Sequence, residues 1–201
     1  VRKYFLFFLI VHCSTDIANA QTFKLTIEGR VDMGGHALPG STVSLFEETV
    51  PMKKKITGKE GQFSFELSPE KNYVLTVTKY GFIEKRFHFS TAGVPSERAR
   101  YGFPDFQFKV TIFKKVDKVD YSLLDAPIAK VHYDKSVQEF GFDESYTTLM
   151  LDALSKLKAL EEQSLQSNSD GGSKRQQREK LEKLKKYRAL IKSGDIALRN
   201  N

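Results

Sequence analysis

Histidines are the side chains in this sequence best suited to acid–base or metal chemistry. His36, His88 and His132 lie beyond the first twenty residues. None of them begins a His-x-x-Glu pair, and the chain has no His-Glu-x-x-His motif, which is the usual spacing of hydrolytic zinc sites. We therefore expect each histidine to be an ordinary turn or strand residue rather than a metal ligand.

Acidic side chains gather at Asp134, Asp143, Glu144 and Asp152. Carboxylates bind calcium, but no loop here has the alternating ligand spacing of an EF-hand. The sequence also lacks a Gly-x-Ser-x-Gly motif, a P-loop and a dinucleotide-binding motif. These observations predict that the protein is not an enzyme and that it uses no metal or other cofactor.

Residues 1–20 are typical of a secretory signal peptide. A short positive segment precedes an apolar run over 4–11, and Ala18 and Ala20 provide the small-x-small cleavage pattern. We expect Gln21 to be the first residue after cleavage. A buried N-terminal strand and an uncleaved anchor are the alternatives.

The only cysteine, Cys13, lies within this leader, and the residues before it do not match a lipidation motif. After cleavage the chain would hold no disulfide and would depend on its core. We expect an exported protein in the periplasm or at the outer-membrane periphery of a Gram-negative bacterium, or a secreted one. No later apolar run approaches the roughly 20 residues of a membrane-spanning helix.

The net charge of +7 is concentrated near the C-terminus. Residues 174–201 carry ten Lys or Arg and three Asp or Glu, which is 10 − 3 = +7. An anionic envelope component is the partner that this tail favours, and nucleic acid is not expected for an exported protein. The candidate contacts are Lys174, Arg175, Arg178, Lys183, Lys185 and Lys186.

Seven short segments are predicted to be β-strands, and in most of them apolar and polar residues alternate with a period of two, which is typical of half-buried strands. They lie at 23–31, 43–45, 52–57, 63–67, 73–78, 83–89 and 106–112. The lysines of 52–57 suit an edge strand, where charge discourages aggregation. The pattern predicts a mainly β fold, with a seven-stranded β-sandwich over 21–115.

A glycine turn precedes the fourth of these segments. We expect Gly58 and Gly61 to adopt positive φ there. Phe63 and Phe65 follow and should pack inward as core residues rather than stack on a sugar.

The loop over 90–105 is long enough to be functional or mobile. Tyr101 and Phe103 are its candidate contact residues. The alternative is that these two rings cap the open end of the sandwich.

The composition changes after residue 115. The segment 116–144 is expected to be an extension that contains a small hairpin, with strands near 128–133 and 137–142. The segment 145–163 has helical periodicity. Its expected apolar stripe consists of Leu149, Leu154, Leu157 and Leu160.

The region 145–201 as a whole is predicted to be helical and basic. A polar linker is expected near 164–173, followed by a second helix over 176–192. Its apolar stripe would consist of Leu181, Leu184, Tyr187 and Ile191. This helix would pack on the first in a coiled-coil-like seam, be loosely solvated, or bind an anionic ligand.

Four segments resemble the carboxypeptidase regulatory-like domain, in the order of that family. They are Gly29–Val31, Leu38–Leu45, Thr57–Phe63 and Tyr73–Phe82, within a match over 23–113. The resemblance implies a transthyretin-like, or prealbumin-like, β-sandwich and no catalytic residues. The segment 106–143 resembles an extension found after such domains in exported proteins of Bacteroidetes-type bacteria.

Together these features favour an exported scaffold or interaction module of the cell envelope, without enzymatic activity. It would bind a partner protein or an anionic envelope component. One alternative is a carbohydrate-binding module in which Tyr101 and Phe103 stack on sugars. Another is an accessory subunit of an envelope or secretion complex. The sequence leaves the oligomeric state open.

Overall fold

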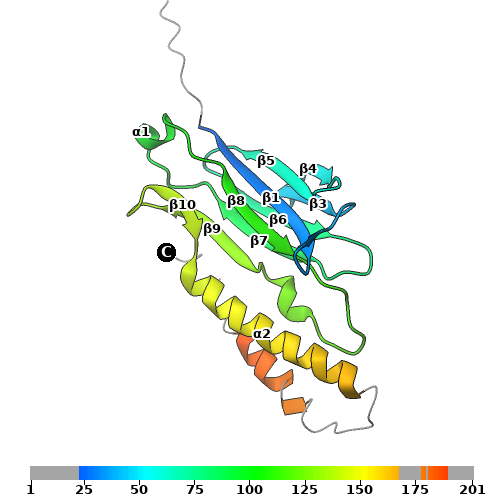
Figure 1. The fold of residues 1–201 in the computed structure, drawn as a ribbon. Coiled ribbons are helices and arrows are strands. Elements are labelled where there is room, and N and C mark those ends of the chain that lie inside the picture. Colours follow the sequence, from blue (N-terminus) through cyan, green and yellow to red (C-terminus); the bar gives the residue numbers. More distant parts are fainter. Residues whose placement is uncertain (1–22, 168–177, 180, 190–201) are drawn as a thin grey trace, which may run out of the picture.

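The computed structural model describes residues 23–167, 178–179 and 181–189. Two β-sheets form a sandwich; the long helix α2 (Glu144–Ser167) lies below it in the view of Figure 1, and the short helix α1 (Ser96–Ala99) lies at its upper end. The predicted fold, a mainly β sandwich followed by a hairpin and a helical region, is confirmed. No helix among the described residues is both long and apolar enough to span a membrane.

The smaller sheet is built around β1 (Leu25–Met33). β5 (Gln62–Leu67) pairs with it in antiparallel orientation, and β8 (Phe106–Thr111) pairs with it in parallel orientation. The two-residue strand β2 (His36–Ala37) pairs with the end of β1. β1 is therefore flanked by strands on both sides.

The larger sheet has the order β10-β9-β7-β6-β3-β4. Its strands are β3 (Thr42–Glu47), β4 (Val50–Ile56), β6 (Asn72–Thr78), β7 (Lys85–Ser90), β9 (Ala129–Asp134) and β10 (Glu139–Phe142). β4 is fully exposed at one edge, as its lysines predict. The predicted hairpin forms β9 and β10, and β9 pairs in parallel with β7, so the hairpin extends a sheet of the sandwich.

The core lies between the two sheets, because alternate residues of each strand point inward. Phe63 and Phe65 are buried within it, which confirms their prediction as core residues. The other fully buried side chains of the two sheets include Leu25, Ile27, Val31, Val43, Leu75, Val77, Phe89 and Val110.

The turn before β5 depends on one glycine rather than two. Gly61 has a φ of +71°, and a Cβ there would lie 2.3 Å from the carbonyl oxygen of Val31. Gly58 has no positive φ and no atom within 4 Å of such a Cβ, so its predicted role is wrong. Glycine is therefore required only at position 61, where the backbone is left-handed and lies close to β1.

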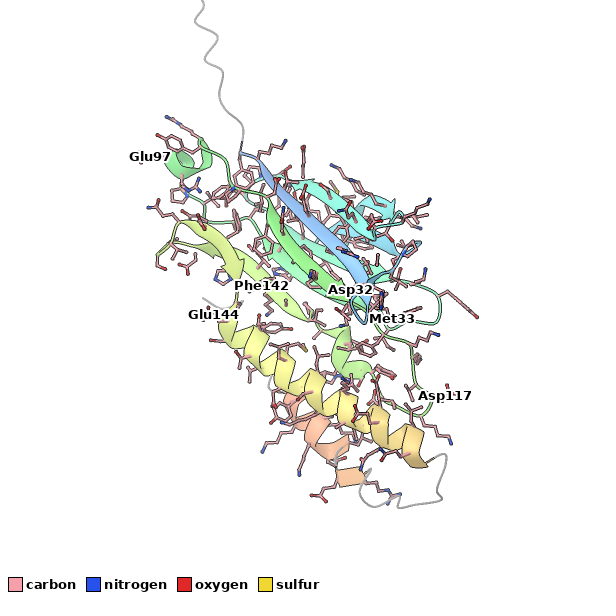
Figure 2. All side chains as sticks on the ribbon, viewed as in Figure 1. Asp32, Met33, Glu97, Asp117, Phe142 and Glu144 are labelled. Carbon is pink, nitrogen blue, oxygen red and sulfur yellow. The ribbon has the colours of Figure 1, made fainter. Side chains whose placement is uncertain are left out.

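The helix α2 (Glu144–Ser167) begins two residues after β10 ends at Phe142 (Figure 2). The side chain of Asp143 accepts a hydrogen bond of 2.9 Å from the N–H of Tyr146, which caps the first turn. The buried face consists of Tyr146, Met150, Ala153 and Leu157. Leu149 is 42% exposed, so its predicted place on the apolar stripe is wrong.

α2 continues to Ser167, past the predicted start of a linker at 164. Ser164 is buried and donates a hydrogen bond of 3.2 Å to the carbonyl oxygen of Asp117. Docking against the segment before the short helix η1 (Ser122–Asp125) therefore accounts for the longer helix. The remainder of the expected linker, 168–173, lies outside the described residues.

Residues 178–179 and 181–189 are helical and lie beside α2 (Figure 1). Leu184 is buried in a cluster with Met150 and Ala153, and Tyr187 packs against the same cluster. Lys156 of α2 donates a hydrogen bond to the hydroxyl of Tyr187. The second helical segment thus packs on the first through one narrow apolar seam.

Candidate functional site

The outward face of the smaller sheet carries a row of cationic and amide side chains. Alternate residues of β1 point to solvent, and Arg30 is one of them. The strand register places Arg30 opposite Gln62 of β5 and opposite Lys109 of β8. We refer to Gln62, Arg30 and Lys109 as the cationic row.

A second row lies beside the first on the same face. Glu28 precedes Arg30 by two residues and lies opposite Ser64 of β5 and Gln107 of β8. The side-chain amide of Gln107 donates a hydrogen bond of 3.3 Å to the carboxylate of Glu28. We refer to Ser64, Glu28 and Gln107 as the polar row.

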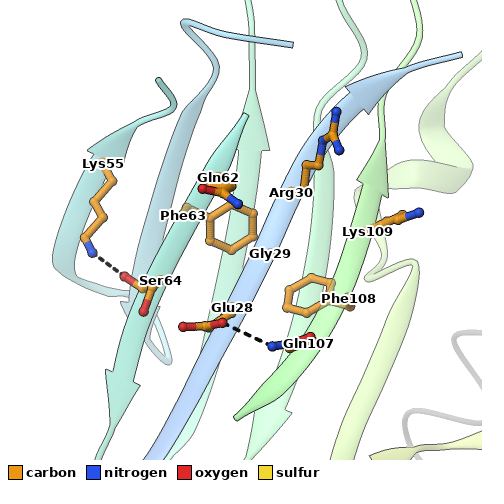
Figure 3. Close-up of a pocket in the computed structure, with 10 residues that line it drawn as sticks. All are labelled: Glu28, Gly29, Arg30, Lys55, Gln62, Phe63, Ser64, Gln107, Phe108 and Lys109. Carbon is orange, nitrogen blue, oxygen red and sulfur yellow. Dashed lines mark hydrogen bonds between the residues drawn. The ribbon is translucent and has the colours of Figure 1, made fainter. Parts of the chain in front are cut away.

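The two rows line an open groove of about 680 Å³ (Figure 3). This volume lies in the range of small-molecule sites. Lys55 of β4 also lines the groove, and its amine donates a hydrogen bond to the carbonyl oxygen of Ser64. The larger sheet therefore contributes one cation at the side of a groove that otherwise belongs to the smaller sheet.

Gly29 lies between the two rows, where its inward-pointing position faces the core. A Cβ there would lie 2.1 Å from Cζ of Phe63. The glycine thus leaves room for the ring of Phe63, whose centroid is 5.8 Å from that of Phe108. These two rings pack under β1 and support the strand that carries Glu28 and Arg30 (Figure 3).

The charges of the cationic row are not compensated by the described part of the chain. Neither Arg30 nor Lys109 has a side-chain hydrogen bond or ion pair among the described residues, and Nε of Arg30 is buried without a partner. Arg30 and Lys109 lie opposite one another on neighbouring strands, which are about 4.8 Å apart, and like charges opposite one another destabilise a sheet.

Another cation near this sheet is paired. Lys24 lies 3.0 Å from Glu66, and this hydrogen bond with its charge attraction lowers the pKa of the Glu66 carboxyl and raises the pKa of the Lys24 amine. Arg30 and Lys109 differ because three cations of the groove face the single carboxylate of Glu28. An anionic group in the groove would supply the missing acceptor.

The structure separates the two predicted contact residues of the 90–105 loop. Tyr101 is 87% exposed. Phe103 is half-buried and packs against Phe23 and Phe140, with ring centroids 5.6 and 4.8 Å away, while Cζ of Arg98 lies 4.1 Å from its centroid. Only Tyr101 presents most of its ring to solvent.

The predicted basic tail is only partly described, since Lys174 and Arg175 lie outside the described residues, whereas Arg178 and Lys186 are exposed. Lys183 and Lys185 lie 3.6 and 2.9 Å from Glu179 and Glu182.

The positive charges of Lys183 and Lys185 are therefore partly neutralised within the helix. The hydrogen bond to Glu182 raises the pKa of Lys185. Arg188, in the same helix, lies 3.6 Å from Asp125 of η1.

The residues of the expected cleavage site, Ala18, Ala20 and Gln21, lie outside the described residues. Within the described ranges, no three His, Cys, Asp or Glu side chains are close enough to hold a metal ion. Sequence reasoning also missed the groove. Its signal was the set of polar residues that alternate with the core positions of 23–31 and 106–112.

No family model matches the sequence, and no curated protein matches it. Several solved structures match part of the chain. The TIE protein of Bacillus anthracis is 21% identical, with a TM-score of 0.36 over 49% of this chain and 20% of that chain. A 3-chlorocatechol 1,2-dioxygenase from Rhodococcus opacus is 11% identical, with a TM-score of 0.35 over 49% and 62%. A DUF3823 family protein from Parabacteroides merdae is 17% identical, with a TM-score of 0.33 over 46% and 47%.

The chain spans less than two thirds of the length of each of these proteins. These likenesses each cover about half of this chain at low TM-scores, and they assign it no activity. The resemblance to the carboxypeptidase regulatory-like domain stays a prediction.

The prediction that the protein is not an enzyme needs correction. Several matching structures are catechol and hydroxyquinol dioxygenases. The prediction relied on missing sequence motifs, whereas catalytic groups often come together from distant positions in a chain.

Proposed function

We propose that this protein is an exported interaction module of the cell envelope, and that the groove on its smaller sheet binds an anionic envelope component. The uncompensated pair of Arg30 and Lys109 carries this proposal. Two adjacent cations on a solvent-facing sheet repel one another. An anion that accepts hydrogen bonds from both would relieve this repulsion and would form charge-assisted hydrogen bonds.

The location in the envelope rests on the leader-like segment 1–20 and its small-x-small pattern at Ala18 and Ala20. The groove lies on the solvent-facing side of the smaller sheet, where an extended anionic chain could reach it. The sandwich would hold the two rows rigid, because β1 is paired on both sides and packed on Phe63 and Phe108.

Binding to immobilised polyanions tests the proposal. Purified protein is passed over polygalacturonate, polyphosphate and dextran sulfate, with neutral dextran as a reference. The double variant Arg30→Gln/Lys109→Gln should bind at least tenfold more weakly to the polyanion that the wild type prefers. The variant Lys54→Gln/Lys59→Gln is a matched control, since it removes the same charge from two exposed residues that do not line the groove.

A third variant addresses the basic tail. Lys183→Gln/Lys185→Gln/Lys186→Gln should leave binding within about threefold of the wild type, because two of these lysines already pair with glutamates. If this variant loses binding and the groove variant keeps it, the anionic component binds the tail and the proposed site is wrong.

A further inference from the structure

The cationic row offers positive charge, whereas the polar row offers hydrogen-bonding groups and one carboxylate. This difference should favour some anionic ligands over others. We propose that the groove binds an acidic polysaccharide whose sugar units each carry one carboxylate beside several hydroxyls, as in a polyuronate. This inference rests on the proposed function above and adds the ligand class. A polyphosphate, which carries negative charge without hydroxyls, is the ligand that the groove would discriminate against.

The cationic row suits a carboxylate. The guanidinium of Arg30 is planar and offers parallel N–H donors that match the two oxygens of a carboxylate. Lys109 on the neighbouring strand adds a second positive charge beside it. Gln62, on the other side of Arg30, offers an amide that can donate to a ring or glycosidic oxygen.

The polar row suits hydroxyls. The carboxylate of Glu28 accepts hydrogen bonds only, and Gln107 already donates to it. Further acceptor capacity of Glu28 faces the groove beside the hydroxyl of Ser64. Because sugar hydroxyls donate and accept, they match a carboxylate, an amide and a hydroxyl placed side by side.

The spacing of the rows joins these two requirements. Glu28 and Arg30 are two residues apart on one strand, so the rows lie about 7 Å from one another. This distance is comparable to the width of one hexose ring. A sugar acid can therefore place its carboxylate on the cationic row and its hydroxyls on the polar row.

The same spacing works against a polyphosphate. A phosphate bound at Arg30 is followed along the polymer by another negative charge, which would face the carboxylate of Glu28. Removal of that carboxylate should therefore weaken the binding of a polyuronate and strengthen the binding of a polyphosphate. A site that only attracts negative charge would respond with stronger binding of both ligands.

The experiment compares polygalacturonate and polyphosphate at equal ionic strength. Wild-type protein should bind polygalacturonate at least tenfold more tightly per charged unit. Glu28→Gln should lower the affinity for polygalacturonate about threefold or more and raise the affinity for polyphosphate, so that the ratio falls about tenfold. Glu60→Gln is the matched control, because Glu60 is an exposed carboxylate outside the groove, and it should leave the ratio unchanged.

A titration with digalacturonate, followed by NMR of side-chain amides, locates the ligand. The amides of Gln62 and Gln107 should shift together. Equal binding of both polymers to the wild type, with an unchanged ratio in Glu28→Gln, would overturn the ligand class while the proposed function stands. If Arg30→Gln/Lys109→Gln instead binds both polymers as tightly as the wild type does, the proposed function itself is wrong.

Discussion

Lys85 is the most unusual single residue in the described part of the chain. It occupies an inward position of β7, in line with Phe87 and Phe89, and is 7% exposed. Its amine lies 4.9 Å from the ring centroid of Phe113 and has no hydrogen-bond or ion-pair partner among the described residues. Burial lowers its pKa to about 8, although the charges of Asp32 and Glu161 oppose this shift.

This burial predicts a specific dependence of stability on pH. Between about 8 and 10.5 the unfolded chain holds a proton on Lys85 that the folded protein has released. The free energy of unfolding therefore rises with pH across this window. At about 1.36 kcal/mol per pKa unit, the buried charge costs about 3 kcal/mol at neutral pH.

The variant Lys85→Met should remove this cost. Urea unfolding at pH 7 should give a free energy about 2–3 kcal/mol higher than that of the wild type. The difference should shrink as the pH rises from about 8 to 10.5, because folded wild-type protein then releases the proton of Lys85 and no longer holds a buried charge. A difference that stays constant from pH 7 to pH 10 would contradict the assignment of a buried, charged amine.

At the scale of elements, α2 buries only one of the two faces that its sequence could bury. Helical periodicity allows two overlapping apolar stripes on this segment, because Leu149, Met150 and Leu151 are adjacent. The structure buries Met150 completely and leaves Leu149 42% and Leu151 61% exposed. The choice follows from Leu123 and Leu184, which pack on the Met150 side.

Two alanine variants test this assignment with the same loss of side chain from one helix. Met150→Ala should lower the free energy of unfolding by about 2–5 kcal/mol, since it leaves a cavity in a buried cluster. Leu149→Ala should cost about 0.5 kcal/mol or less. Urea titrations followed by circular dichroism measure both free energies of unfolding. Equal losses for the two variants would contradict the assignment of the Met150 face as the packed face of α2.

At the scale of the whole molecule, the hairpin β9–β10 completes the sandwich. β9 pairs with β7 through Ala129 and Val131, and both residues belong to the buried core. Phe140 of β10 packs 4.8 Å from Phe103, centroid to centroid, at one end of the sheets. A boundary at residue 115 would therefore cut through one hydrophobic core.

Two fragments test whether the sandwich needs the hairpin. The fragment 21–115 should unfold with a free energy roughly 5 kcal/mol lower than that of 21–144, at about 1.5–3 kcal/mol for each large apolar side chain that loses its burial. The shorter fragment should also bind a hydrophobic dye, because removal of β9 exposes core side chains next to β7. Equal unfolding energies for the two fragments would show that residues 116–144 form a separate extension.

The sequence by itself determined the strands and their inward residues, because the alternation that buries Leu25, Phe65 or Leu75 is a local, period-two pattern. It also determined the lysine-rich edge strand and the two helical segments. It could not show that Glu28 meets Gln107, which is 79 positions away, or that Arg30 meets Lys109. Parallel pairing of distant strands depends on the packing of the whole sandwich. For the same reason the burial of Lys85, the recruited face of α2 and the groove itself were decided only by the tertiary structure.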